Sequence, residues 1–359
     1  MRMAYQSRTG VTGMKRRRFL ANTPGGTFAP LLPELPEPTH AEYALLRVSR
    51  RAMATKFEIA IPYGTPNALA AASDALDLID DLEDQLTIYR DSELMQINET
   101  AANGWVAVEP KLFQLLQTCA AYTLETGGAF DAATGALTEA WGFQRRQGGV
   151  PSPLQRAEAM AKTGMRHVML NAETRSIKYR QHGLKLNLGS IGKGYALDCA
   201  AEMLQTRWGI RSALLHGGGS SVRAIGVPPD DTRGWPIAIR HPWDTARTLG
   251  TVRLNGCGFA TSAATFQHFE YNGKKLGHVL DPRTGWPADG TASASVLART
   301  AAEADAYSTA YFVLGADTKR HQGSVILTDC DTLAIDLPSD KYAPATFRER
   351  YLNDLSFPD

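Results

Sequence analysis

The pattern of apolar and polar positions becomes regular from residue 45 onward. Residues 55–61 alternate polar and apolar side chains, which is typical of a strand with one buried face. Residues 68–86 carry apolar side chains at helical spacing and acidic side chains on the opposite face, which predicts an amphipathic helix. We therefore expect a folded region that begins near residue 45.

Further helices and strands follow without a regular strand–helix–strand rhythm. The expected helices run from Pro110 to Gly127-Gly128, over a short stretch from Ser152-Pro153, over residues 191–206, and over residues 303–314. The expected strands cover residues 166–170, 176–179, 184–188, much of 212–254, and a terminal hairpin of 325–327 with 333–335. This irregular order favours an α+β fold over a doubly wound parallel sheet.

Composition narrows the class of protein without indicating its chemistry. The 359 residues include 38 Lys and Arg against 37 Asp and Glu, a formal net charge of +1. Such a chain lacks the basic excess that nucleic-acid binding needs, and no stretch approaches the roughly 18 apolar residues of a transmembrane helix. The four cysteines are too scattered for a zinc site or a disulfide framework, so we expect small buried hydrophobes.

The first 43 residues differ in composition from the rest. The basic run at 15–20 (KRRRFL) resembles a twin-arginine export signal, but prolines, Asn22 and Glu34 interrupt the apolar stretch expected after it. We interpret residues 1–43 as a disordered leader and residues 44–359 as the folded domain. If the leader acts as an export signal, the protein is periplasmic or otherwise extracytoplasmic; otherwise it is cytoplasmic.

Two glycine-rich segments invite comparison with standard ligand motifs. Residues 187–194 (NLGSIGKG) stand between an expected strand and helix, where free backbone N–H groups bind phosphate. They do not form a Walker A loop, because Asn187 stands at the first glycine position and Gly194 replaces the Ser or Thr. Residues 216–219 (HGGG) resemble a lipase oxyanion motif, but the chain has no G-x-S-x-G elbow, which argues against an α/β-hydrolase.

Two more segments combine glycine with polar residues. Residues 127–135 (GGAFDAATG) follow the expected second helix, and a helix cap with a turn would by itself explain them. Residues 277–285 (GHVLDPRTG) place a His, an Asp and an Arg in one turn, which supplies a base, an acceptor and an anion-binding fork. Taken singly, each segment is ambiguous.

Taken in order, these segments resemble the ApbE family of FAD:protein FMN transferases, from about residue 45 to at least residue 315. The segments that carry the resemblance are residues 53–57, 92–94, 127–142, 187–195, 217–226, 260–262, 278–287 and 304–315. The most specific are GGAFD at 127–131 with WGF at 141–143, GKGYA at 192–196, and HVLDPRTG at 278–285.

The resemblance implies an α+β flavin-trapping fold with mixed or antiparallel sheets, flanking helices and two closely packed subdomains. It further implies bound FAD as substrate, Mg²⁺ near the pyrophosphate, and transfer of FMN to a Thr or Ser hydroxyl of an acceptor flavoprotein subunit with release of AMP. Attack on a doubly charged pyrophosphate needs cationic or N–H donors, and an alcohol nucleophile must lose its proton to a base. No nucleic acid and no transmembrane span are expected.

Carried over position by position, the resemblance implies three groups of site residues. The metal positions are Ser190, Asp305, Ser308 and Thr309. The FAD-contacting positions are Met53, Tyr89, Ala129, Phe130, Asp131, Asn187, Lys193 and Leu280. His278 is the expected base, and Arg283 is the expected neighbouring group that stabilises negative charge.

The sequence departs from the family pattern at three places. Asn187 stands where an Asp is usual, Ser308 stands where some members have a further acidic ligand, and Ser220-Ser221 replace the Asp that usually follows the paired glycines. Each change lowers the local negative charge, so metal affinity should be weaker. Two alternative functions are therefore open: an FAD pyrophosphatase that uses water as acceptor, and a non-catalytic flavin-binding protein.

Overall fold

The computed structural model describes residues 44–145, 148–242, 244, 246–263, 268–271, 274–315, 324–328 and 333–336. Residues Tyr43–Asp359 form one compact unit. The expected leader over residues 1–43 lies outside the described residues, so its role stays a prediction. Within the described part, no helix combines the length and the apolar character needed to cross a membrane.

An antiparallel sheet of eight strands runs through this unit in the order β1-β2-β6-β7-β10-β13-β14-β15. Its strands are β1 (Leu45–Ala52), β2 (Thr55–Pro62), β6 (Ala213–Gly217), β7 (Ser221–Ile225), β10 (Gly258–Ala263), β13 (Thr291–Ala298), β14 (Ser324–Thr328) and β15 (Leu333–Asp336). Met53 and Ala54 connect β1 to β2 with φ of 49° and 60°. Positive φ at both positions of a two-residue turn matches the right-handed twist of the flanking strands.

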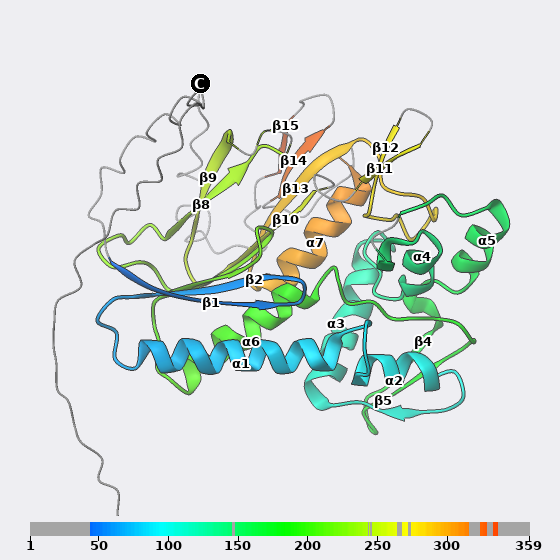
Figure 1. Cartoon of the computed structure of the whole chain (residues 1–359), viewed down its shortest axis with the longest axis horizontal. Helices are drawn as coiled ribbons and strands as arrows, with labels where there is room; N and C mark the ends of the chain where they lie inside the picture. The colour runs from blue at the N-terminus through cyan, green and yellow to red at the C-terminus, as the bar shows by residue number, and fades with distance from the viewer. Residues whose placement is uncertain are drawn as a thin grey trace, which may run out of the picture. The chain divides into compact units, whose positions relative to one another are not determined.

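Three helices cover one face of the large sheet, and a hairpin covers the other (Figure 1). The helices are α1 (Ala68–Leu86), α6 (Gly192–Thr206) and α7 (Ala301–Leu314), and the hairpin is β8 (Trp235–Arg240) with β9 (Thr248–Leu254). Phe57, Ile59 and Ile61 of β2 pack in the helix-side core, whereas Ala60 packs with Trp235 on the hairpin side. Alternate side chains of β2 therefore pack into two different cores, one on each face of the sheet.

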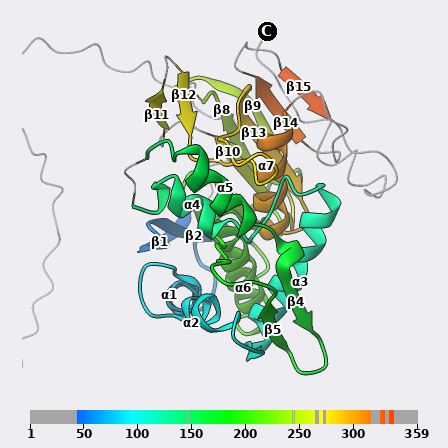
Figure 2. The same cartoon turned by 90° about the vertical axis from the view of Figure 1, so that its right-hand side faces the viewer.

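A second part of the unit packs against these helices (Figure 2). It contains α2 (Glu93–Thr100), α3 (Pro110–Glu125), α4 (Gly135–Ala140), η1 (Phe143–Arg145), α5 (Pro153–Ala161), η2 (Met165–His167), and the small sheet β3 (Val106–Ala107), β5 (Ser176–Tyr179) and β4 (Val168–Asn171). Hairpin β11 (His268–Tyr271) with β12 (Lys274–Gly277) completes the described elements. Tyr195 of α6 packs against the cores of both parts, so this helix joins them.

The fold class expected from the sequence is confirmed. All described strand pairs are antiparallel, and helices flank the sheets. The expected elements that recur are the strands over 55–61, 176–179 and part of 166–170, the helices over 68–86, 191–206 and from Pro110 and Pro153, and the terminal hairpin. Cys119, Cys199 and Cys257 are buried, as expected, and Cys330 lies outside the described residues.

Other expectations were wrong in instructive ways. Residues 184–188 form no strand, because their backbone bonds to separate segments: Leu186 N–H donates to Asn98 Oδ1, and Asn187 N–H donates to Ala132 O. The last expected helix begins two residues early, at Ala301, because the Thr300 hydroxyl caps it. Helices α2 and α4 were not expected, since they are too short to show a clear period.

Helices α6 and α7 meet at a point where only glycine fits. A Cβ built on Gly194 would lie 2.2 Å from the carbonyl oxygen of Ala301. This approach is far shorter than any real Cβ contact, and the obstacle is backbone rather than a flexible side chain. The glycine therefore fixes the distance between the first turns of the two helices.

We expect Gly194→Ala to lower the free energy of unfolding by about 2–3 kcal/mol, because the helices must separate to admit the methyl group. Gly104→Ala is the matched control, since a Cβ at Gly104 meets nothing within 4 Å, and its effect should be within about 0.5 kcal/mol. Urea unfolding of both variants measures the difference. Equal stability of the two variants would contradict the packing argument.

Candidate active site

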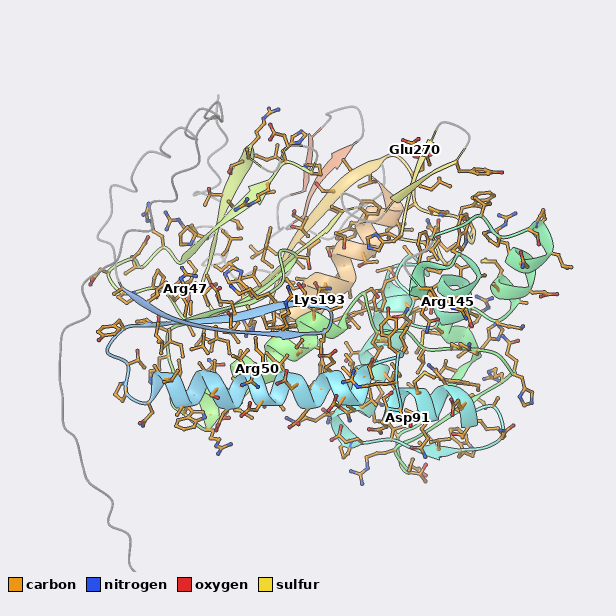
Figure 3. All side chains as sticks on the ribbon, in the orientation of Figure 1. Arg47, Arg50, Asp91, Arg145, Lys193 and Glu270 are labelled. Carbon is orange, nitrogen blue, oxygen red and sulfur yellow. The ribbon has the colours of Figure 1, made fainter. Side chains whose placement is uncertain are left out.

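The side chain of Asp305 is the centre of a buried polar group between α6, α7 and β7. Gly194 N–H donates to its Oδ2 at 2.7 Å, and the Ser221 hydroxyl donates to its Oδ1 at 2.6 Å. Lys193 Nζ lies 3.9 Å from Oδ2, and Figure 3 labels this lysine at the start of α6. Because Asp305 is only 5% exposed, these donors hold its carboxylate in one orientation.

Three hydroxyls extend this group along α7 toward β10. Ser308 Oγ and Thr309 Oγ1 each donate to the Asp305 carbonyl oxygen, at 3.0 and 3.1 Å. Ser262 Oγ, on β10, lies 2.9 Å from Ser308 Oγ and 3.2 Å from Thr309 Oγ1. The result is a compact set of oxygens with a single carboxylate at its end.

Asp198 positions the first turn of α7, and α7 is the helix that carries Asp305. Its two carboxylate oxygens accept the N–H groups of Ala301 and Ala302 at 2.9 and 2.8 Å, and Arg223 Nε lies 3.0 Å from Oδ1. Burial raises the pKa of Asp198 to about 6, against the lowering effect of these partners. A side chain of α6 thus satisfies free N–H groups at the start of another helix.

The expected base and its neighbour lie in a hydrogen-bonded loop after β12. His278 is half-buried directly after that strand. The Asp281 carboxylate accepts from Arg283 N–H, Nε and Nη2, each at 2.9 Å, and this pairing raises the pKa of Arg283. Because Asp281 N–H also donates to Trp286 O at 2.8 Å, the turn has one defined shape.

This loop contacts the segment that follows α3, so the glycine-rich segments 127–135 and 277–285 lie against each other. A Cβ on Gly128 would lie 3.6 Å from Arg283 Cγ, and Gly128 has a φ of 81°. Trp141 Nε1 donates to Gly285 O at 2.9 Å. On the other side, Val279 packs in the cluster that contains Tyr307 of α7. Helix α7 therefore supports both the loop and the Asp305 group.

The predicted flavin-contacting residues differ in accessibility. Ala129, Phe130, Asp131 and Leu280 are buried. The Asp131 carboxylate already accepts the N–H groups of Ala133 and Met165, and burial raises its pKa. In this structure Asp131 shapes the loop after α3 from within.

The remaining predicted residues are more accessible. Tyr89 is 70% exposed and presents an open aromatic face. Met53 is half-buried at the tip of the β1–β2 hairpin, and Ser190 is half-buried in the turn before α6. Asn187 Oδ1 accepts the Gly189 N–H at 2.9 Å, so its amide shapes that turn. The structure places Lys193, Ser308 and Thr309 with Asp305, as described above.

Three residues with a role in this site were not among those predicted: Asp198, Ser221 and Ser262. Ser221 and Ser262 lay within segments that the family resemblance singled out, yet their hydrogen bonds to α7 depend on strand neighbours far away in sequence. Asp198 lies four residues after Gly194 on α6, so its helical spacing could have suggested a shared face. No sequence signal identifies its partners on α7.

The donor set around Asp305 suits a small, hard cation. The atoms that could bind a metal here are all oxygens: the Asp305 carboxylate and the hydroxyls of Ser262, Ser308 and Thr309. Mg²⁺ is commonly bound by one or two carboxylates, with water and substrate phosphates completing its shell. Among the described residues there is no group of three or more His, Cys, Asp or Glu side chains that could hold a metal by itself. This group therefore offers one carboxylate to a metal, and other ligands would have to complete the metal's shell.

Comparison with known proteins agrees with this architecture. The model of the ApbE family matches residues 53–323, so the chain belongs to the ApbE family. A Klebsiella pneumoniae (strain 342) FAD:protein FMN transferase is 33% identical over 251 residues, which cover 69% of this chain and 77% of the relative. An Escherichia coli (strain K12) protein of the same name is 32% identical over 292 residues, covering 78% and 81%.

Solved structures share the fold. The ApbE protein of Thermotoga maritima matches with a TM-score of 0.75 and 27% identity, covering 82% of this chain and 97% of that one. The apo form of the Pseudomonas stutzeri flavinyl transferase ApbE matches with a TM-score of 0.68 and 27% identity, covering 77% and 86%. The family expected from the sequence is therefore confirmed.

As the pH rises from about 4 to about 6, we expect the free energy of unfolding of the original protein to fall relative to that of the Asp198→Asn variant. The folded-state pKa of Asp198 is about 6, whereas an unfolded Asp titrates near about 3.9. In this window the folded state keeps a proton that the unfolded state has released, so rising pH favours unfolding, by at most about 3 kcal/mol. Urea unfolding at several pH values measures both proteins; a difference that does not change with pH would contradict this prediction.

Proposed function

We propose that this chain transfers FMN from FAD to a Thr or Ser hydroxyl of an acceptor protein and releases AMP. Its family membership and its relatives named FAD:protein FMN transferase support this function. The observation that carries it is the Asp305 group at the start of α6, where a buried carboxylate, hydroxyls and Lys193 converge. Such a combination suits binding and polarising a pyrophosphate.

In the proposed reaction, the acceptor oxygen attacks the phosphorus atom of the FMN half of FAD. A new P–O bond forms to the acceptor, the P–O bond to the bridging oxygen breaks, and that oxygen leaves with AMP. His278 takes the proton of the acceptor hydroxyl in this proposal, since its imidazole lies, half-buried, in the loop that the family resemblance singled out. Both alternatives, hydrolysis and simple flavin binding, would leave the acceptor unmodified.

Cationic and N–H groups of this chain would stabilise the negative charge on the phosphate oxygens of FAD during the reaction. Lys193 is 26% exposed at its side chain, so it can turn from Asp305 toward a phosphate. Arg283 is held by Asp281 in a fork that leaves its remaining N–H groups available. A bound Mg²⁺ would supply further neutralisation of phosphate charge, held by Asp305 with the hydroxyls of Ser308 and Thr309.

We expect His278→Ala to lower FMN transfer by at least about 100-fold while FAD binding stays within about twofold, because a general base acts on the acceptor proton alone. The readout is a fluorescent acceptor band that survives denaturation, with FAD binding measured by fluorescence quenching. His182→Ala is the control, since His182 is exposed on a turn after β5. Full activity of His278→Ala would contradict the assignment of His278 as the base. AMP release without labelling of the acceptor would favour the alternative function, an FAD pyrophosphatase.

Ser308→Asp should increase the stabilisation that Mg²⁺ gives to the protein. A second carboxylate beside Asp305 repels it in the absence of metal and becomes a ligand in its presence. About 1 kcal/mol of added metal binding energy corresponds to a rise of roughly 2–4 °C in the melting temperature. Ser308→Asn controls for the size of the side chain. The same Mg²⁺-induced shift in the original protein and both variants would speak against a metal at this group.

A further inference from the structure

The described Lys and Arg residues from 145 to 180 share one feature. None of them has a carboxylate within 4.0 Å among the described residues. Elsewhere the pattern is mixed: Arg50, Arg90 and Arg207 each pair with acidic residues of α1, whereas Arg211 and Arg247 have no such partner among the described residues. In a chain of nearly balanced charge, this stretch therefore carries several basic side chains without a close acidic partner among the described residues.

Lys162, Arg166 and Arg180 form the centre of this region, and we call these three residues the basic surface. All three are exposed. Arg180 N–H donates to the carbonyl oxygen of His167 at 2.9 Å, and Arg166 precedes that histidine. The pKa of His167 is lowered by burial and by the charges of these two arginines. Lys162 lies at the end of α5, against Gly183 of the turn after β5.

Helix α5 also contacts the loop that carries His278. The guanidinium of Arg156 lies 4.6 Å from the ring centre of Trp286, and a Cβ on Gly285 would lie 2.6 Å from Met160 Sδ. Lys162 follows Met160 by two residues. Helix α5 therefore links the basic surface, which begins at its C-terminal end, to the candidate catalytic loop, and Figure 2 shows α5 near the loop after β12.

Exposed apolar side chains lie along the same path. Trp286 is 37% exposed in the loop, and Leu154 is 69% exposed on the first turn of α5. Aromatic and arginine side chains are enriched at protein interfaces, and unpaired charge at the rim steers a partner of opposite charge. A protein whose hydroxyl reaches His278 would extend over this surface, because a typical interface covers about 800 Å² on each partner.

We infer that the basic surface, together with Trp286, docks the acceptor protein through an acidic face of that protein. This inference rests on the proposed function and adds the charge of the partner and the place where it binds. An acidic acceptor is favoured over an anionic membrane because the reaction itself brings a protein to the adjoining loop. FAD needs no part of this surface, since Lys193 and the Asp305 group are available for its phosphates.

The test compares two variants with the same change in charge. Arg166→Glu/Arg180→Glu reverses charge within the basic surface. Arg211→Glu/Arg247→Glu reverses two other exposed arginines that also lack a carboxylate partner among the described residues. The substrate is the flavin-free form of an acceptor protein that the Escherichia coli relative modifies, assayed with FAD and Mg²⁺ from 20 to 300 mM NaCl.

We expect the first variant to lose about tenfold in kcat/KM for the acceptor at low salt, with the KM for FAD unchanged, and to approach the original protein at high salt. The control variant should stay within about twofold. No difference between the variants would overturn the inference, and so would an equal rise in the KM for FAD. Reduced sedimentation with phosphatidylglycerol vesicles, without an effect on the acceptor, would assign the surface to a membrane.

A direct binding measurement separates this inference from the proposed function. In a His278→Ala background, the flavin-free acceptor should bind the otherwise unchanged chain about tenfold more tightly at low salt than it binds the Arg166→Glu/Arg180→Glu variant. If the original chain binds the acceptor in this way but transfers no FMN, the proposed function fails and the docking surface stands. If transfer occurs and binding ignores the charge reversal, the docking surface fails alone.

Discussion

The close contact between the first turns of α6 and α7 is the constraint on which the site depends. Gly194 admits the Ala301 carbonyl because it has no Cβ, and its own N–H donates to Asp305. In return, Asp198 of α6 accepts the first free N–H groups of α7. Each helix thus satisfies polar groups of the other, so a shift of either would leave buried donors or acceptors unpaired.

Polar side chains from distant parts of the chain meet at this pair of helices. Strands β7 and β10 bring Ser221 and Ser262 to α7, while Tyr307 on another side of α7 packs against Tyr122 of α3, with ring centres 5.1 Å apart. The segment after α3 then reaches Arg283. Helix α7 is buried on most of its sides for this reason, and it carries the few polar residues that the site needs.

The sequence predicted most long elements and the family, because helical and strand periods are local and the motifs are short and ordered. The family resemblance implied Asp305 and Thr309 as a pair, and their spacing of four residues puts them on one face of α7. The sequence did not reveal that the Asp131 carboxylate accepts hydrogen bonds from the backbone N–H groups of Met165 and Ala133. Nor did it reveal that the backbone of residues 184–188 forms hydrogen bonds with several separate segments instead of one strand. Those outcomes depend on tertiary neighbours that no local pattern records.

The connection between β10 and β13 has a consequence for how the family can diversify. These strands are hydrogen-bonded neighbours, yet residues 264–290 lie between them in sequence and include β11, β12 and the His278 loop. The entropy of closing such a loop grows only slowly with its length. The fold can therefore accept a longer, shorter or different insertion at this point at little energetic cost to the sheet, while helices α6 and α7 keep their positions.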